Sequence, residues 1–329
     1  MSRIETHGPW VSLNAIWYYM ANPGQLQRLR KHEKNLPTDY IGRLSTRLNK
    51  PNPADGEMCR GMMIKANGAV FGCEIGGREG APWVTFNNSL ATNLLMWDDQ
   101  VAALKADFRI LRYDKRGHGA SPVARTPYAL DDLVGDVVAI WDALGVRRSH
   151  VVGLSIGGRM ALRLAIGHPE RLLSAVISNT RADVPDPIRK LWQARIDTAR
   201  RDGMDRLAND TVERWCSPSF FATDTAVLDK MRAMVRSTSV DGYVQGARAL
   251  MDHDDRAVLG GIGVACLFIA GRDDTSAAPD HMRAMSEAVP GARFVELAPA
   301  GHISNMEQPE AYNVALGQFL LERAPRLGG

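Results

Sequence analysis

A serine stands between two glycines in the run Gly153-Leu154-Ser155-Ile156-Gly157, and this spacing suits a nucleophile. The apolar residues 150–154 favour a buried strand and residues from Gly158 onward have helical spacing, so Ser155 is expected on a sharp strand-to-helix turn. Such a turn requires small flanking residues, and it presents the hydroxyl at a helix N-terminus, where negative charge is stabilised. We predict that Ser155 is a catalytic nucleophile; the alternative is a glycine-rich turn without chemistry.

A serine hydroxyl becomes a good nucleophile when a neighbouring base accepts its proton. Among the eight histidines, His302 follows the last expected strand and precedes the last expected helix, and sites in open α/β sheets form at such loops. We therefore predict that His302 is the base. The competing histidines have less suitable places, in a glycine-flanked turn, at a strand start, before a proline and in a first helical turn: His118, His150, His168 and His281.

The carboxylate that orients the base should follow a strand between nucleophile and base, because α/β-hydrolases order their triad as serine, acid, histidine. The apolar run 266–270 ends in Gly271-Arg272-Asp273-Asp274. In α/β-hydrolases the acid usually lies three residues after a glycine that ends the strand. Counted from Gly271, this position is Asp274. Asp273 stays open as the alternative, with a solvated turn or an ion pair to the adjacent arginine as its non-catalytic role.

Acyl transfer also needs donors for the negative oxygen of its tetrahedral intermediate. In this fold backbone N–H groups supply them, one from the residue after the nucleophile and one from the loop after the third strand. The first is Ile156. The loop is Asn87-Asn88-Ser89-Leu90, in which we expect the N–H of Leu90 to be the second donor, with Ser89 as the alternative.

The elements that must position these residues alternate between short apolar runs and longer helical patterns, which is typical of a mainly parallel sheet flanked by helices. We expect strands at 62–65, 70–75, 83–87, 109–113, 150–154, 175–178, 266–270 and 293–297. Helices are expected at 94–105, 130–144, 158–167, 279–289 and 309–321. The strand pattern stops between about 183 and 256, where helical spacing predicts an insertion.

These patterns divide the chain into four segments. Residues 61–182 and 257–329 are expected to form the two parts of an α/β core, and residues 183–256 a helical cap. Residues 1–60 form an N-terminal extension that ends in a linker rich in proline and asparagine. Because its aromatic stretch around Trp10 and Trp17 is too apolar to leave in water, we expect helices there that pack on the core or on a second subunit of a homo-oligomer.

Composition excludes several classes of protein. The 329 residues carry 40 basic and 37 acidic side chains, a formal net charge of +3, which is no nucleic-acid footprint. The four cysteines have neither paired nor metal-ligand spacing. The apolar stretch 10–20 is too short to span a membrane and lacks a cleavage site. We expect a cytoplasmic protein that needs no cofactor or metal, takes a small-molecule substrate, and binds no nucleic acid or membrane.

Several segments together resemble the 3-oxoadipate enol-lactonases, a branch of the α/β-hydrolases. The superfamily is marked by residues 113–121 (Tyr-Asp-Lys-Arg-Gly-His-Gly-Ala-Ser) and by the serine motif. The branch is marked by residues 301–309 (Gly-His-Ile-Ser-Asn-Met-Glu-Gln-Pro) and by residues 213–220. The resemblance covers about residues 61–321. It implies an eight-stranded core with a helical cap, and hydrolysis of an enol-lactone without a cofactor; the N-terminal extension has no counterpart in the typical enzyme.

Specificity is harder to assign. Ser89, Trp97 and Trp215 are expected to contact substrate, with core packing as the alternative for both tryptophans. Three arginines of the expected cap are candidates for binding a substrate carboxylate, with solvated surface charge as the alternative: Arg232, Arg236 and Arg248.

We therefore expect a serine hydrolase that opens a lactone or cleaves a small carboxylic ester through an acyl-enzyme. One alternative is cleavage of a β-diketone carbon–carbon bond, or of an amide, by the same triad. A non-catalytic binding protein on this fold is the other, and the intact set of Ser155, Asp274 and His302 argues against it.

Overall fold

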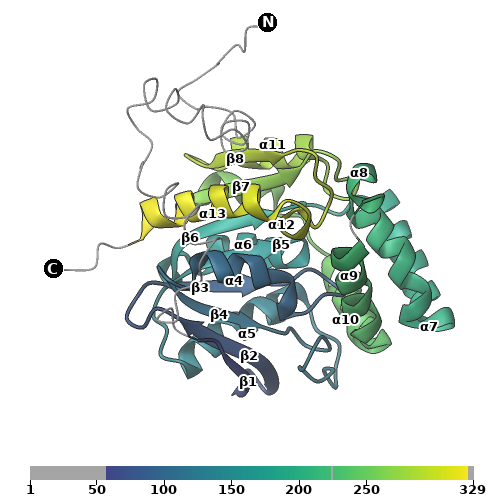
Figure 1. The fold of residues 1–329 in the computed structure, drawn as a ribbon, viewed down its shortest axis with the longest axis horizontal. Coiled ribbons are helices and arrows are strands. Elements are labelled where there is room, and N and C mark those ends of the chain that lie inside the picture. The colour runs from purple at the N-terminus through teal and green to yellow at the C-terminus, as the bar shows by residue number, and fades with distance from the viewer. Residues whose placement is uncertain (1–56, 224, 325–329) are drawn as a thin grey trace, which may run out of the picture. The chain divides into compact units, whose positions relative to one another are not determined.

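One sheet organises the residues that the computed structural model describes, 57–223 and 225–324 (Figure 1). Its strands are β1 (Cys59–Ala66), β2 (Ala69–Gly77), β3 (Trp83–Asn87), β4 (Arg109–Tyr113), β5 (Ser149–Leu154), β6 (Leu172–Ser178), β7 (Cys266–Gly271) and β8 (Arg293–Leu297). They pair in the order β1-β2-β4-β3-β5-β6-β7-β8. β2 runs antiparallel to β1 and β4, and the other neighbouring pairs are parallel. The expected eight-stranded, mainly parallel sheet is confirmed.

The strands at the centre of the sheet are covered on both faces. Every residue of β5 and of β7 is buried, and both sequences are nearly continuous apolar runs, as strands covered on two sides require. β1 lies at the edge, and most of its side chains are exposed or half-buried. β1 extends beyond the strand expected at 62–65 because polar residues at both ends of this exposed edge strand interrupt the apolar pattern.

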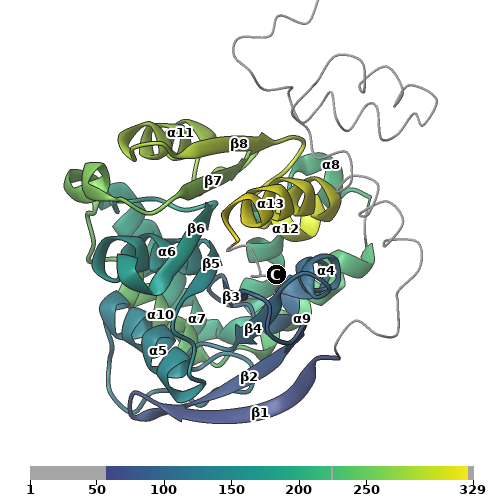
Figure 2. The same cartoon turned by 90° about the vertical axis from the view of Figure 1, so that its left-hand side faces the viewer.

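Helices cover both faces of the sheet (Figure 2). α4 (Asp98–Leu104) contacts α13 (Pro309–Arg323) on one face, and α5 (Leu130–Ala143) contacts α6 (Ile156–Gly167) on the other. α11 (Pro279–Ala288) packs on β7 and β8. The helix expected over 94–105 is divided, because the Asn93 side chain caps a separate 3-10 turn, η2 (Leu94–Trp97), by accepting from the N–H of Leu95. Short turns complete the core: η3 (Pro169–Arg171), η4 (Arg256–Gly261) and α12 (Ser304–Glu307).

Four helices are inserted between β6 and β7, and Figure 1 shows them together along one side of the sheet. They are α7 (Asp186–Trp215), α8 (Pro218–Phe221), α9 (Thr225–Ser237) and α10 (Val240–Leu250). α7 contacts both α9 and α10. It is kinked at Gly203, where φ of 79° and ψ of 178° interrupt the helical backbone. We call α7–α10 the helical insertion; it occupies the segment in which the sequence predicts a cap.

The N-terminal predictions fall almost entirely on residues that the structure does not describe. The expected helices and the subunit contact of the extension lie there, and β1 begins at Cys59, inside the segment expected to be linker. Within 57–223 and 225–324, no helix is both long and apolar enough to cross a membrane.

Candidate active site

Ser155 lies on the turn between β5 and α6 in a conformation that non-glycine residues rarely adopt, with φ of 60° and ψ of −118°. Such a backbone costs about 1–3 kcal/mol and persists where the surrounding structure fixes it. The Ser155 N–H donates to the carbonyl of Ser178 over 3.0 Å, and the Thr180 hydroxyl donates to the carbonyl of Ser155 over 2.8 Å. The end of β6 and the residues after it therefore hold the turn.

Gly153 and Gly157 make this turn sterically feasible. A Cβ atom at Gly153 would lie 1.9 Å from the carbonyl oxygen of Gly157, and a Cβ atom at Gly157 would lie 2.0 Å from that of Asn87. Both distances are far inside van der Waals contact, so any larger residue would force the backbones apart. The glycine spacing in the sequence thus has a steric cause, the backbone approach of β3, β5 and α6 around Ser155.

His302 follows β8, and its imidazole contacts the carboxylate of Asp274, which follows β7. His302 Nδ1 lies 2.8 Å from Asp274 Oδ2. The N–H of His302 donates to the carbonyl of Trp215 over 2.6 Å, so the helical insertion holds the backbone of the histidine loop. Because a carboxylate accepts only, this contact assigns the proton to Nδ1 and leaves Nε2 as the acceptor that faces away from Asp274.

The Asp274 carboxylate is buried and fully hydrogen-bonded. Its Oδ1 accepts from the N–H groups of Ser276 and Ala277 over 2.8 and 3.0 Å, and Oδ2 also accepts from Asn179 Nδ2 over 3.1 Å. Burial disfavours the charged form, but the adjacent His302 and these donors outweigh it, so the pKa of Asp274 is lowered below its ordinary value. Asp274 is therefore ionised where it contacts the His302 ring.

Asp273 has a different place, although it is the immediate neighbour in the sequence. Its side chain is exposed, Oδ2 accepts from the N–H of Ala300 over 3.1 Å, and its own N–H donates to the Ala300 carbonyl over 2.8 Å. Asp273 thus fastens the loop before the histidine, whereas Asp274 contacts the imidazole.

The loop after β3 leaves one of three consecutive backbone N–H groups without an acceptor among the described residues. The N–H of Ser89 donates to Met96 Sδ over 3.3 Å, and the N–H of Ala91 donates to His118 Nε2 over 3.2 Å. Within the described chain, the Leu90 N–H between them has no hydrogen-bond acceptor. The N–H of Ile156 opens α6, where helix geometry supplies no acceptor either. Leu90 and Ile156 thus each have an N–H group left for an external acceptor.

Two buried side chains that sequence analysis assigned no role hold this loop. Lys115 Nζ donates to the carbonyl of Ser89 over 2.5 Å, and His118 Nδ1 lies 3.0 Å from the carbonyl of Arg116. Burial, reinforced by the charge of Lys115, lowers the pKa of His118 well below its ordinary value, so the ring is neutral and Nε2 accepts from the loop. Both side chains belong to residues 113–121, the segment that marks the superfamily, and this membership is the sequence feature that points to them.

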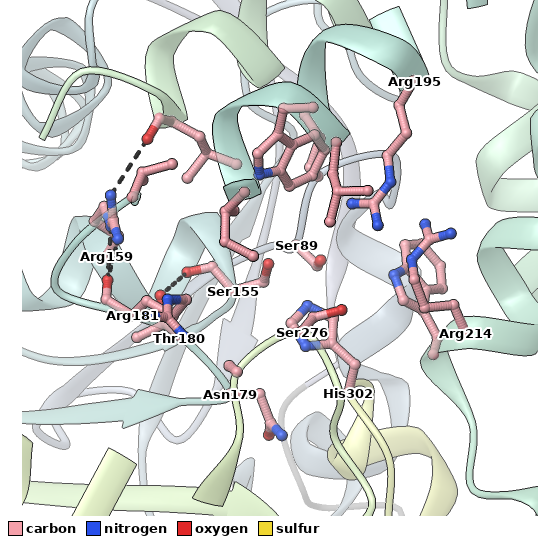
Figure 3. Close-up of a pocket in the computed structure, with 18 of the residues that line it drawn as sticks. Ser89, Ser155, Arg159, Asn179, Thr180, Arg181, Arg195, Arg214, Ser276 and His302 are labelled. Atoms are coloured by element: carbon pink, nitrogen blue, oxygen red, sulfur yellow. Dashed lines mark hydrogen bonds between the residues drawn. The ribbon is translucent and has the colours of Figure 1, made fainter. Parts of the chain in front are cut away.

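Ser155 and His302 both line a cavity of about 260 Å³ (Figure 3). Ser89 and Trp215, expected to contact substrate, and Leu90, expected in the oxyanion hole, also line this cavity. Ser155 and His302, both within the described chain, are not hydrogen-bonded to each other; such contacts are often loose before a substrate binds. The far wall comes from the helical insertion and is partly apolar: Ile188, Leu191, Trp192 and Leu250.

Trp97 does not reach this cavity, which corrects its expected role in substrate binding. Its side chain is completely buried and packs on Phe86 and Tyr312, with ring centroids 4.9 and 6.3 Å away. Its Nε1 donates to Asn88 Oδ1 over 3.0 Å. The alternative, core packing, is correct because η2 turns the indole toward the sheet.

The three arginines suggested for carboxylate binding are also absent from the cavity wall. Arg232 pairs with Asp229 over 2.8 Å and Arg236 with Asp205 over 3.4 Å, so both are surface ion pairs of the insertion. Arg248 is exposed on α10. The arginines that do line the cavity are Arg159, Arg181, Arg195 and Arg214. Arg195 and Arg214 lie in the charged helical sequence of α7, which gave no sign of a place in the cavity.

Known proteins share this arrangement. It combines a strained serine turn after a parallel strand with a histidine, held by a carboxylate, after the last strand. Residues 82–309 match the family described as the alpha/beta hydrolase fold. The chain belongs to the α/β-hydrolase family. Among the curated relatives of this hydrolase, 3-oxoadipate enol-lactonase 2 of Acinetobacter baylyi is 34% identical over 240 residues, which cover 73% of this chain and 89% of the relative.

Further relatives of this hydrolase include a second enol-lactonase and proteins with other described activities. A putative carbamate hydrolase of Caulobacter segnis is 31% identical over 76% of this chain and 94% of its own length. Among solved structures, the enol-lactonase from Burkholderia xenovorans is 37% identical, covers 79% of this chain and 100% of its own, and has a TM-score of 0.76. A thermophilic esterase from Thermogutta terrifontis is 26% identical, with a TM-score of 0.75 over 80% of this chain and 100% of its own.

Proposed function

We propose that this hydrolase opens a lactone or cleaves a small carboxylic ester through an acyl-enzyme on Ser155. In this proposal His302 is the general base and acid, and Asp274 orients it. The N–H groups of Leu90 and Ile156 form the oxyanion hole. Two of the activities described among the relatives, enol-lactonase and esterase, both involve attack on an acyl carbonyl.

The first half of the reaction forms the acyl-enzyme. Ser155 Oγ attacks the carbonyl carbon while its proton passes to His302 Nε2, and the carbonyl electron pair moves onto the oxygen. Leu90 and Ile156 donate to this oxyanion. When the tetrahedral intermediate collapses, the carbon–oxygen bond to the leaving group breaks, and the imidazolium returns its proton to the departing oxygen. In a lactone the leaving oxygen stays attached through the opened ring.

The second half releases the acid. A water molecule donates its proton to His302 Nε2 as its oxygen attacks the acyl carbon. The new tetrahedral intermediate then expels Ser155 Oγ, which regains the proton from the imidazolium. Throughout, the ionised Asp274 stabilises the imidazolium, because its lowered pKa keeps the negative charge beside Nδ1.

One observation carries the proposal: a serine in a strained turn and a histidine held by a buried carboxylate open onto the same cavity. Strained backbone at a cavity wall persists when function requires the geometry. The two free backbone N–H groups beside the serine supply the remaining part that acyl transfer needs.

The test is a substrate panel of lactones, enol-lactones, aryl esters, carbamates, amides and cyclic diketones, assayed with the wild type and with Ser155→Ala. We expect turnover of lactones or esters by the wild type and a loss of at least about a thousandfold in kcat for Ser155→Ala. Ser276→Ala is the matched control, since it removes a hydroxyl from the same cavity wall and leaves the N–H that binds Asp274. Equal turnover by Ser155→Ala and wild type, or turnover of diketones or amides alone, would refute the proposal.

A further inference from the structure

Two arginines and a tyrosine form a cationic corner of the cavity. Arg195 and Arg214 lie on the two halves of α7, on either side of the kink at Gly203, and Tyr243 lies on α10. All three side chains line the cavity that Ser155 lines. Figure 3 shows the guanidinium groups of Arg195 and Arg214 pointing toward one another, away from Arg159.

Neither guanidinium of this corner forms an ion pair within the described chain, although the carboxylate of Asp210 acts weakly on Arg214. Arg214 donates only to neutral oxygens, the Asp210 carbonyl over 3.1 Å and the Thr211 hydroxyl over 3.4 Å. Arg195 lies over the Trp192 ring, 4.9 Å from its centroid. The Tyr243 hydroxyl has no hydrogen-bond partner among the described residues.

The two other arginines of the cavity wall show what a structural role looks like here. Arg159 is buried and donates to three carbonyl groups, those of Arg181, Leu250 and Asp183, which tie α6 to the segments around the insertion. Arg181 pairs with Asp183 over 3.0 Å. The donors of Arg159 are therefore satisfied by carbonyl groups and Arg181 has an anionic partner, whereas the guanidinium groups of the cationic corner form no ion pair among the described residues.

Two like charges in a half-buried corner are unfavourable without a counter-charge. Burial and, to a smaller extent, the neighbouring charge of Arg195 together lower the pKa of Arg214 to about 10. Burial also lowers the pKa of Arg195. A bound anion would remove this repulsion and satisfy the open donors. The corner therefore has the electrostatics of an anion-binding site in which no carboxylate of the described chain pairs with the arginines.

We propose that Arg195, Arg214 and Tyr243 bind a carboxylate carried by the substrate, and so hold its acyl carbonyl at Ser155. Two planar guanidinium groups and one phenol hydroxyl provide several donors that converge on one oxygen pair. A cavity of about 260 Å³ admits only a small molecule, so the carboxylate and the scissile bond belong to one short chain or ring. This inference rests on the proposed function for its scissile bond, but the anion site itself does not.

The first test compares matched substrates. Monophenyl esters of linear five- to seven-carbon dicarboxylic acids are compared with analogues whose distal carboxylate is a primary amide, after subtraction of spontaneous hydrolysis. We expect the wild type to prefer the carboxylates by about 10- to 100-fold in kcat/KM. Arg195→Met and Arg214→Met should each reduce this preference at least about fivefold, while Arg248→Met, on the exposed side of α10, leaves it unchanged. No preference in the wild type, or an unchanged preference in both variants, would overturn the proposal.

The second test separates the anion site from the chemistry. Glutarate and inorganic phosphate are titrated by calorimetry into Ser155→Ala, and into Ser155→Ala combined with Arg195→Met or Arg214→Met. We expect glutarate to bind, with a Kd that rises at least about tenfold in both double variants. If phosphate bound more tightly than glutarate, the assignment to a carboxylate would be wrong. If Ser155→Ala kept full turnover, the proposed function would fall, while glutarate binding that depends on the arginines would still support the anion site.

Discussion

The buried carboxylate of Glu307 accepts a 2.8 Å hydrogen bond from the N–H of Gly301, the residue before the histidine of the site. Its two oxygens also accept from the N–H and hydroxyl of Ser217, just after α7. One side chain therefore joins the histidine loop to the helical insertion. The proposed base is thus positioned from two sides, by Asp274 through its ring and by the insertion through its backbone.

We predict that Glu307→Ala lowers both stability and activity. Removal of the carboxylate leaves buried N–H groups unpaired, which should lower the free energy of unfolding by about 2–4 kcal/mol. kcat should fall more than KM rises, since the loop that carries His302 loses an anchor. Glu310→Ala is the control, because Glu310 is exposed on α13. Urea unfolding and steady-state kinetics check both effects; similar behaviour of the two variants would contradict this account.

The serine turn predicts a sharp difference between two glycines of α6. In Gly157→Ala the new Cβ would meet the Asn87 carbonyl, so we expect a loss of about 3 kcal/mol or more in unfolding free energy and near-complete loss of activity. At Gly167, near the end of the same helix, a Cβ would have no atom within 4 Å. Gly167→Ala should therefore be neutral or stabilising by up to about 1 kcal/mol. Equal tolerance of both substitutions would show that the turn is not as tight as described.

The two neighbouring aspartates should differ in kinetics. Asp274→Asn removes the charge beside His302 Nδ1 and permits the wrong tautomer, so kcat should fall by about 10³- to 10⁴-fold. Asn at 273 still accepts from the N–H of Ala300, and Asp273→Asn should therefore cost less than about tenfold. The comparison is made in one assay with the same substrate. A larger loss for Asp273→Asn would reverse the assignment of the acid.

Lys115 makes the stability of the protein depend on pH. Burial lowers its pKa from 10.5 to about 7, which the nearby Asp114 only partly offsets. Between pH 7 and 10 the unfolded chain then binds a proton that the folded chain does not, so the contribution of this group to stability rises with pH. From pH 7 to 9 the wild type should gain about 2 kcal/mol relative to Lys115→Met, measured by urea unfolding. Parallel pH profiles of the two proteins would exclude a perturbed Lys115.

Much of the core could be predicted because its signals are local. The strands expected at 83–87, 109–113 and 293–297 have the observed bounds, since short apolar runs between turns leave little choice of register. The expected places of Ser155, Asp274 and His302 followed from the ends of the strands predicted at 150–154, 266–270 and 293–297. The division of the helix expected over 94–105 was missed because the Asn93 cap competes locally with the apolar spacing.

The parts that could not be predicted depend on contacts distant in sequence. Arg195 and Arg214 lie far apart along α7, on opposite sides of its kink. Each alone is indistinguishable from a solvated arginine until the kink and the packing over the cavity are known. Trp97 and Trp215 presented the same apolar side chain to sequence analysis. One packs in the core and the other lines the cavity, and only the tertiary structure distinguishes them.

Covalent labelling shows directly whether Ser155 is the nucleophile of this hydrolase. The wild type is treated with a fluorophosphonate ester, and the labelled residue is located by peptide mass spectrometry. We predict one label per chain on Ser155, none on that peptide in Ser155→Ala, and much slower labelling in His302→Gln. Stoichiometric labelling of another residue, or an undiminished labelling rate in Ser155→Ala, would contradict the account.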